Sequence, residues 1–137
     1  CSPKSYNSQI GVPLSVWQIR SIHNLAILEA GISMPGEMQQ LKQVIEPTMG
    51  LFTNIGAAHD EGFTDRRQKV REKLQLFKEV EVLFYCRDHD LIDQEVRKAG
   101  IHGFTWSRKG NADVVITNEL REHGNTELTL RINEQMH

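Results

Sequence analysis

The chain has 137 residues, of which 39% are hydrophobic and 25% are charged, and this length and composition fit one globular domain with a single core. The formal net charge of −2 gives no basic surface for nucleic acid, and no apolar run reaches the roughly 20 residues of a transmembrane helix. The polar first residues do not resemble a signal peptide, and the two cysteines, Cys1 and Cys86, are too few for a disulfide framework, so we expect a cytoplasmic protein.

The first half of the chain alternates between predicted helices and predicted strands. Residues 10–19 have helical apolar periodicity, with Pro13 near the start, where a helix tolerates proline. The apolar run within 25–31 predicts a strand that is buried on both faces. A helix over 35–45, closed by Pro47, and a second strand over 51–55 follow.

The second half continues the alternation and then changes. We expect a charged amphipathic helix over 65–80, a strand over 82–86, a helix over 90–99 and a strand over 102–106. Two strand-like runs, 113–120 and 126–132, surround Gly124-Asn125 and predict a hairpin. The fold class is therefore α/β, with a mostly parallel sheet, flanking helices and a C-terminal antiparallel hairpin. The chain lacks an initiator Met and ends in a strand-like pattern, so we expect a piece of a longer protein.

Polar residues follow the first two predicted strands. Glu29 comes at the end of the first strand, and Asn54 and His59 come at and after the end of the second. Because the ends of parallel strands share one edge of a sheet, Glu29 and His59 are candidates for a Mg²⁺ site. The alternatives are a solvated carboxylate at Glu29 and a loop-capping imidazole at His59. Asn54 either reads a nucleobase or holds an Asx-turn.

Three further features carry candidate chemistry. Lys73 falls inside the apolar arc of helix 65–80, where it either serves the site or snorkels to solvent. The polar, turn-forming segment 2–13 suits substrate contact. Asp88 follows the third strand and is a candidate ligand, whereas Asp90 is a candidate N-cap. No Gly-x-x-x-x-Gly-Lys-Ser/Thr phosphate loop occurs in the sequence.

These stretches together resemble the central ATPase domain of the Mur ligases. The matching segments are Tyr6-Asn-Ser-Gln-Ile-Gly-Val-Pro13, Leu28-Glu-Ala-Gly31 with Gly36-Glu37, and Thr53-Asn-Ile-Gly-Ala-Ala-His-Asp-Glu-Gly-Phe63. The first and third segments are specific in combination, whereas Glu-Ala-Gly alone is not. The resemblance covers essentially the whole chain, more loosely after Asp90. It makes residues 1–137 a partial central, ATP-binding domain that lacks its phosphate loop.

The resemblance implies an ATP- and Mg²⁺-dependent peptide synthetase of peptidoglycan precursor synthesis. It is greatest for the members that activate UDP-N-acetylmuramoyl-tripeptide as an acyl phosphate, which the amine of D-alanyl-D-alanine then attacks. The opening is also similar to proteins in which such a ligase is fused to an alanine racemase. Because the phosphate loop and the flanking ligase domains are not among these residues, we expect this chain alone to be inactive.

The family pattern also implies a role for particular residues. Glu29 and His59 hold magnesium, and Lys73 is carbamylated and supports the metal site, so that Lys73 and His59 are the candidate catalytic residues. The family's Asn-Ala-Asp after the third strand reads Cys86-Arg-Asp88 here, which keeps the aspartate and loses the asparagine. The remaining assignments are ATP contacts at Asn54 and Asp88 and substrate contacts at Tyr6, Asn7 and Ser8.

Two other functions remain open. A related ATP-dependent ligase such as folylpolyglutamate synthetase shares the metal and lysine positions, but the Asn-x-x-Ile-Gly-Val-Pro opening argues against it. A non-catalytic α/β binding module is the second alternative. A Gly-Lys-Thr/Ser loop encoded shortly before Cys1 would favour the synthetase over the module.

Overall fold

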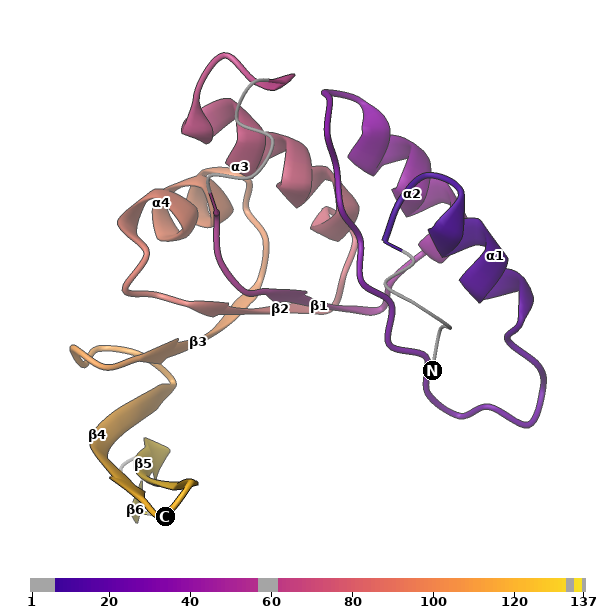
Figure 1. Cartoon of the computed structure of the whole chain (residues 1–137). Coiled ribbons are helices and arrows are strands. Elements are labelled where there is room, and N and C mark those ends of the chain that lie inside the picture. The colour runs from indigo at the N-terminus through magenta and orange to yellow at the C-terminus, as the bar shows by residue number, and fades with distance from the viewer. Residues whose placement is uncertain (1–6, 57–61, 133–134, 137) are drawn as a thin grey trace. The chain divides into compact units, whose positions relative to one another are not determined.

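The computed structural model describes residues 7–56, 62–132, 135 and 136 (Figure 1). The chain divides into two compact units. Unit 1 comprises Cys1–Thr48 and Ile55–Glu79, and unit 2 comprises Met49–Asn54 and Val80–His137. The described part of unit 1 is built from helices, and unit 2 contains a sheet and one helix.

Unit 1 contains α1 (Gly11–Trp17), α2 (Glu37–Ile45), α3 (Arg66–Leu74) and the 3₁₀ helix η2 (Gln75–Phe77). The helices predicted over 10–19 and 35–45 are confirmed. The helix predicted over 65–80 is shorter, because the α-helix ends at Leu74 and continues as one 3₁₀ turn. The helices are joined by a core of buried apolar side chains: Val12, Ile32, Met38, Leu41, Phe63 and Leu76.

Polar contacts define where the helices of unit 1 begin. The Asp65 carboxylate accepts a hydrogen bond from the backbone N–H of Gln68 at 2.7 Å, which caps the N-terminus of α3. The Ser8 hydroxyl accepts one from the N–H of Gly11 at 3.2 Å, at the start of α1. These contacts supply acceptors for N–H groups that have no partner inside the helix.

The strand predicted over 25–31 is wrong: this stretch has no regular secondary structure. The Leu25 and Ile27 side chains are 69% and 86% exposed, so the run is not buried as its composition suggested. A strand exists only when a neighbour satisfies its backbone groups, and within the described ranges no strand pairs with this segment. The expectation that Glu29 lies at a strand end fails for the same reason.

Unit 2 is organised around a six-stranded sheet, in which the strands follow in chain order. Strands β1 to β4 are parallel neighbours, and β4, β5 and β6 pair antiparallel. This arrangement confirms the predicted fold class of a mostly parallel sheet with a C-terminal antiparallel part. The strands are β1 (Met49–Phe52), β2 (Val82–Cys86), β3 (Gly103–Ser107), β4 (Val114–Glu122), β5 (Asn125–Ile132) and β6 (Gln135–Met136).

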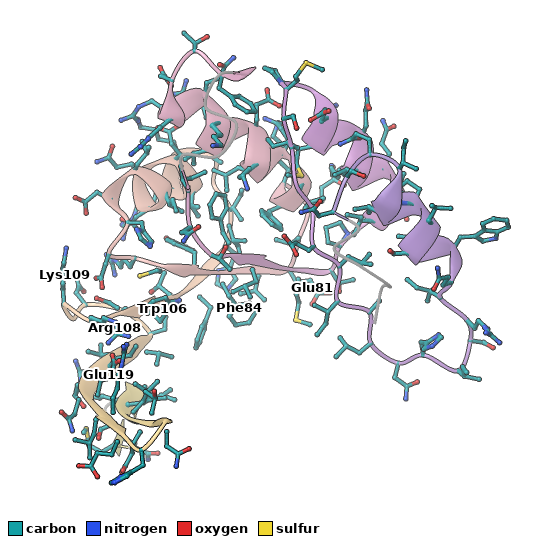
Figure 2. The ribbon with its side chains drawn as sticks, in the orientation of Figure 1. Glu81, Phe84, Trp106, Arg108, Lys109 and Glu119 are labelled. Atoms are coloured by element: carbon teal, nitrogen blue, oxygen red, sulfur yellow. The ribbon has the colours of Figure 1, made fainter. Side chains whose placement is uncertain are left out.

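Helix α4 (Asp90–Lys98) covers one face of the sheet in unit 2 (Figure 1). The Tyr85 hydroxyl of β2 donates a hydrogen bond to Asp93 of α4 at 2.8 Å. Phe84 projects from the other side of β2 (Figure 2) and its ring centroid lies 5.4 Å from that of Phe104. Asp90 is not the N-cap as predicted, because the helix already includes it and His89 precedes it.

The hairpin predicted around Gly124-Asn125 is present one residue earlier. His123 and Gly124 occupy the turn with φ of 49° and 81°, the left-handed conformation that two-residue hairpin turns require. Glu122 pairs with Asn125 across this turn. An ion pair between Arg108 and Glu119 joins the loop after β3 to β4 (Figure 2). None of the helices in the described ranges is long and apolar enough to cross a membrane.

Candidate functional site

Asn7 holds the segment around Glu29 at two points. The Asn7 side-chain amide donates a hydrogen bond to Glu29 Oε1 at 3.3 Å. The backbone N–H of Gly31 donates one to the Asn7 carbonyl at 2.7 Å. Glu29 itself is exposed. Its carboxylate therefore faces solvent from a segment whose backbone is fixed by the chain that precedes α1.

Two lysines lie one turn apart on α3. Lys69 is 3% exposed, and its Nζ donates a hydrogen bond to the Gly56 carbonyl at 2.9 Å. The same ammonium lies 6.0 Å from the centroid of the Phe63 ring, within the range of a cation–π contact. Lys73, four residues later, is half-buried. Both side chains thus turn inward from the helix, as the arc calculated from the sequence predicts for Lys73.

The pKa of Lys73 is lowered by its surroundings. Burial is the largest cause, and the positive charge of Lys69 lowers the pKa further, whereas the Glu29 carboxylate raises it. All three groups belong to unit 1. The structure therefore brings Glu29 and Lys73 into one charged neighbourhood, and the lowered pKa increases the fraction of neutral Lys73 amine.

Removing Lys69 and removing Glu29 should move the pKa of Lys73 in opposite directions. In Lys69→Met the pKa of Lys73 should rise, because a nearby cation is lost, and in Glu29→Gln it should fall further. NMR titration of the chain with ¹⁵Nζ-labelled lysines measures both shifts. Because burial remains in each variant, the pKa of Lys73 should stay below the ordinary lysine value throughout. A Lys73 that titrates at the ordinary lysine value would contradict its burial.

Some of the other residues predicted to contact the metal or the substrates lie within the described part of the chain. His59 and Tyr6 lie outside the described residues, so their predicted roles remain predictions. Ser8 is among the described residues, and its hydroxyl accepts the hydrogen bond from the N–H of Gly11 at the start of α1. Asn54 is exposed two residues beyond β1, in unit 2. Within the described ranges, no group of three or more His, Cys, Asp or Glu side chains is placed to hold a metal.

Asp88 organises the loop that follows β3. One carboxylate oxygen accepts a hydrogen bond from the Ser107 hydroxyl at 2.5 Å, and the other accepts one from the backbone N–H of Arg108 at 2.8 Å. Partial burial works to raise the pKa of Asp88, but the hydrogen bonds from Ser107 and Arg108 outweigh it, so the pKa is lowered. Both carboxylate oxygens of Asp88 therefore already accept hydrogen bonds from other residues of unit 2.

Asp88→Ala should reduce the free energy of unfolding by about 1–3 kcal/mol at neutral pH, because Ser107 and Arg108 lose a charged acceptor. Since the folded-state pKa of Asp88 is lowered, this stabilisation is complete above the ordinary aspartate pKa and disappears as pH falls through the lowered value. Urea unfolding at neutral pH and in strong acid tests both points. Asp88→Asn, which retains an acceptor, is the control and should lose less. A difference that persists undiminished in strong acid would count against the carboxylate as its source.

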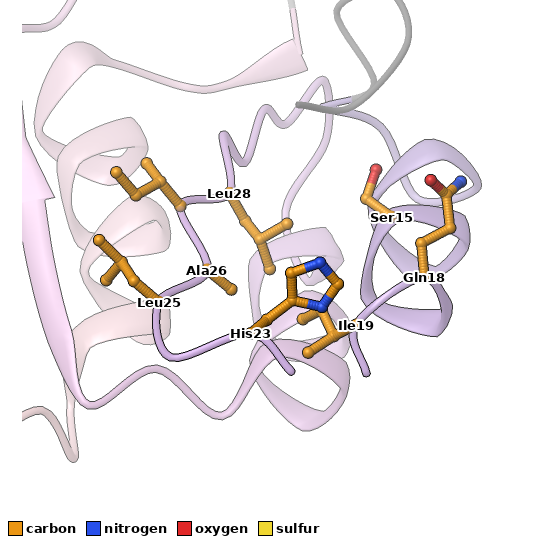
Figure 3. Close-up of a pocket in the computed structure, with 8 residues that line it drawn as sticks. Ser15, Gln18, Ile19, His23, Leu25, Ala26 and Leu28 are labelled. Carbon is orange, nitrogen blue, oxygen red and sulfur yellow. The ribbon is translucent and has the colours of Figure 1, made fainter. Parts of the chain in front are cut away.

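Unit 1 also contains a pocket. Its volume is about 190 Å³, and it opens between the end of α1 and the irregular segment 25–28 (Figure 3). Among the described residues that line it, His23 is the ionisable one, and its Nδ1 accepts a hydrogen bond from the N–H of Arg20 at 2.9 Å. The lining within the described part of the chain contains none of the residues assigned from the sequence.

Sequence reasoning missed one residue and one contact that shape these regions. Ser107 is 1% exposed, and besides donating to Asp88 its hydroxyl accepts hydrogen bonds from the N–H groups of Lys109 and Gly110. The contact of Asn7 with Glu29 was also missed, because it joins residues 22 positions apart. The available signal was local only: a serine three residues before a glycine at a strand end, which is typical of a turn.

Known proteins with related sequences are ligases. The chain is 34% identical over 76 residues to the UDP-N-acetylmuramoyl-tripeptide–D-alanyl-D-alanine ligase of Treponema pallidum, covering 56% of this chain and 17% of that protein. It is 33% identical over 91 residues to the Bacillus subtilis protein of the same name, covering 64% of this chain and 20% of the relative. The matched segments thus span a fifth or less of these relatives.

Solved structures of low sequence identity share the fold. MurF from Acinetobacter baumannii matches with a TM-score of 0.85 at 20% identity, over 99% of this chain and 30% of that one. A MurF ligase from Thermotoga maritima in complex with ADP gives 0.84 at 22% identity, over 99% and 32%. The apo form of L. casei FPGS gives 0.60 at 12% identity, over 81% and 27%. A family model described as the Mur ligase middle domain matches residues 1–136. The chain therefore belongs to the Mur ligase middle domain family.

Proposed function

We propose that this chain is the partial middle domain of an ATP-dependent ligase that joins D-alanyl-D-alanine to UDP-N-acetylmuramoyl-tripeptide in the cytoplasm. The observation that carries the proposal is the neighbourhood of Glu29 and Lys73 in unit 1, within a chain of the Mur ligase family. In the proposed reaction, the terminal carboxylate of the tripeptide attacks the γ-phosphorus of ATP and releases ADP. The amine of D-alanyl-D-alanine then attacks the acyl phosphate, forms the amide and releases phosphate and a proton.

Glu29 fits the role of a magnesium ligand. Mg²⁺ usually keeps several waters and takes one or two carboxylates together with substrate phosphates. Glu29 is exposed, and within the residues that the structure describes only its Oε1 accepts a hydrogen bond, which suits this coordination. His59 is the second proposed ligand and lies outside the described residues. When bound, the metal would neutralise negative charge that develops during phosphoryl transfer. Glu29 would supply one carboxylate oxygen to that cation.

Lys73 is proposed to carry a carbamate. Its ammonium would first lose one proton to the solvent. The neutral amine would then attack CO₂, form an N–C bond and release a second proton, so that a cation becomes an anion. Two observations support this assignment: Lys73 is turned inward from α3, and its lowered pKa increases the fraction of neutral amine. The resulting anion would support the metal site together with Glu29.

The remaining assignments concern the two substrates. Asn54 and Asp88 are proposed to contact ATP, and Asp88 would do so while it also holds Ser107 and Arg108. Tyr6 and Ser8 are proposed to contact the UDP-linked substrate. Asn7 was assigned to the same substrate from the sequence, and in the structure its side-chain amide donates a hydrogen bond to Glu29. Because no phosphate loop occurs in this sequence, the 137-residue chain alone should bind ATP weakly. A fused alanine racemase remains part of the proposal for the longer protein only.

The proposal is tested on the full-length gene product. Release of ADP and phosphate is measured with Mg·ATP and with UDP-N-acetylmuramoyl-tripeptide and D-alanyl-D-alanine, together and singly, and the product is weighed by mass spectrometry. We expect phosphate release and the pentapeptide mass only when both substrates are present. Activity with a folate and glutamate in their place would instead identify a folylpolyglutamate synthetase. Absence of ATP turnover with either pair would favour a non-catalytic binding module.

A further inference from the structure

Asn7 contacts the segment that carries Glu29 at two points. Its side-chain amide reaches Glu29 Oε1 at 3.3 Å, and its backbone carbonyl receives the N–H of Gly31 at 2.7 Å. Asn7 is partly buried, whereas Glu29 is exposed. The asparagine is thus the more fixed partner, and the glutamate is the one whose orientation is set by the contact.

The close approach of the two segments depends on Gly31. A Cβ added to Gly31 would lie 3.3 Å from both the side-chain carbonyl carbon and the backbone oxygen of Asn7. Such a separation is tighter than ordinary van der Waals contact, so a side chain here would push Asn7 away from Glu29. The absence of a side chain at position 31 therefore allows the Asn7–Glu29 contact.

We propose that Asn7 is a positioning residue, which holds Oε1 of Glu29 so that Oε2 is presented to a divalent cation. Within the described part of the chain, Oε2 receives no hydrogen bond, whereas Oε1 is held by the Asn7 amide. A carboxylate that is held through one oxygen loses less rotational freedom when the other binds a metal. Groups that hydrogen-bond to a metal ligand typically contribute about 10–100-fold to metal affinity. This inference rests on the proposed function, in which Glu29 binds the metal.

The test measures metal binding directly. Mn²⁺ is titrated into the full-length gene product in the presence of ADP, and free Mn²⁺ is followed by electron paramagnetic resonance. We expect Asn7→Ala to weaken Mn²⁺ binding by about 10-fold, the lower end of the range, because the hydrogen bond is long and exposed. Asn24→Ala, an exposed asparagine of the same unit, is the matched control and should leave binding unchanged.

A double-mutant cycle separates positioning from other effects. If Asn7 acts through Glu29, Asn7→Ala should weaken Mn²⁺ binding no further in a Glu29→Ala background. In steady-state assays, Asn7→Ala should raise the half-saturating Mg²⁺ concentration and leave KM for the UDP-linked substrate unchanged. Asn7→Leu, which preserves volume, repeats the measurement if thermal unfolding shows that the alanine variant does not fold.

Each of the remaining outcomes would contradict one specific claim about Asn7 or Glu29. If Glu29→Ala weakens Mn²⁺ binding and Asn7→Ala does not, the positioning role is wrong and the metal role of Glu29 stands. If the two effects add in the double variant, Asn7 does not act through Glu29. A raised KM for the UDP-linked substrate with unchanged Mn²⁺ affinity makes Asn7 a substrate contact instead. If Glu29→Ala leaves Mn²⁺ binding unchanged, the metal assignment in the proposed function itself fails.

Discussion

Glu29→Ala in the full-length gene product should lower kcat by a factor on the order of 10²–10³, comparable to the loss of one group that stabilises transition-state charge. The reason is that a metal ligand acts on charge that develops during phosphoryl transfer rather than on recognition of the UDP-linked substrate. KM for that substrate should therefore change little. Initial rates at saturating Mg·ATP, with the UDP-linked substrate varied, measure both parameters.

The matched control for Glu29 is Glu127→Ala, which removes an exposed carboxylate from β5. Its kcat should equal that of the unmodified protein, because Glu127 has no proposed contact with the metal or with either substrate. A normal kcat with a raised KM in Glu29→Ala would make Glu29 a substrate-binding residue, and the magnesium role would have to be abandoned.

Leu41→Ala should reduce the free energy of unfolding of unit 1 by about 2–5 kcal/mol, the usual range for a buried leucine. Leu41 is 1% exposed and lies in the core that joins α1, α2 and η2. Because a domain is typically stable by only about 5–15 kcal/mol, this loss is a large part of the total. Urea unfolding followed by far-ultraviolet circular dichroism measures it.

Leu25→Ala is the matched control for the core substitution. Leu25 is 69% exposed in the irregular segment, so its removal should change the free energy of unfolding by no more than about 0.5 kcal/mol. Because the chemical change is the same at both leucines, the difference between the two losses of unfolding free energy measures the effect of burial. A loss at Leu25 as large as that at Leu41 would mean that residues 25–31 pack against other parts of the chain in solution.

The elements of unit 2 were largely predictable because their signals are local. The strand at 82–86 and the helix beginning at 90 coincide with β2 and α4, since periodicity and Gly100 mark their limits. The hairpin was predictable from Gly124, which supplies the positive φ that its turn needs. Boundaries still moved by a residue or two, as at β3 and at the turn, because hydrogen bonding to neighbours sets where a strand ends.

The sequence indicated which residue types belong to the candidate site, but it did not indicate which residues they contact. The inward placement of Lys73 followed from helix geometry alone, and the structure adds Lys69 as a buried cation one turn earlier. The partners of Asp88 did not follow from the sequence, because the Ser107 hydroxyl that donates to it is 19 residues away. Periodicity reports which face of an element a residue occupies, and it carries no information on which distant loop meets that face.

The sequence by itself determined the alternation of helices and strands, the turn of the hairpin and the resemblance to the Mur ligases, because each depends on residues close together in the chain. The tertiary structure alone decided the state of residues 25–31. Their composition is that of a buried strand, yet they are irregular and exposed, since a strand is completed by the backbone of a neighbour. It also decided that Asn7 meets Glu29, because a contact between residues 22 positions apart is fixed only when the chain folds.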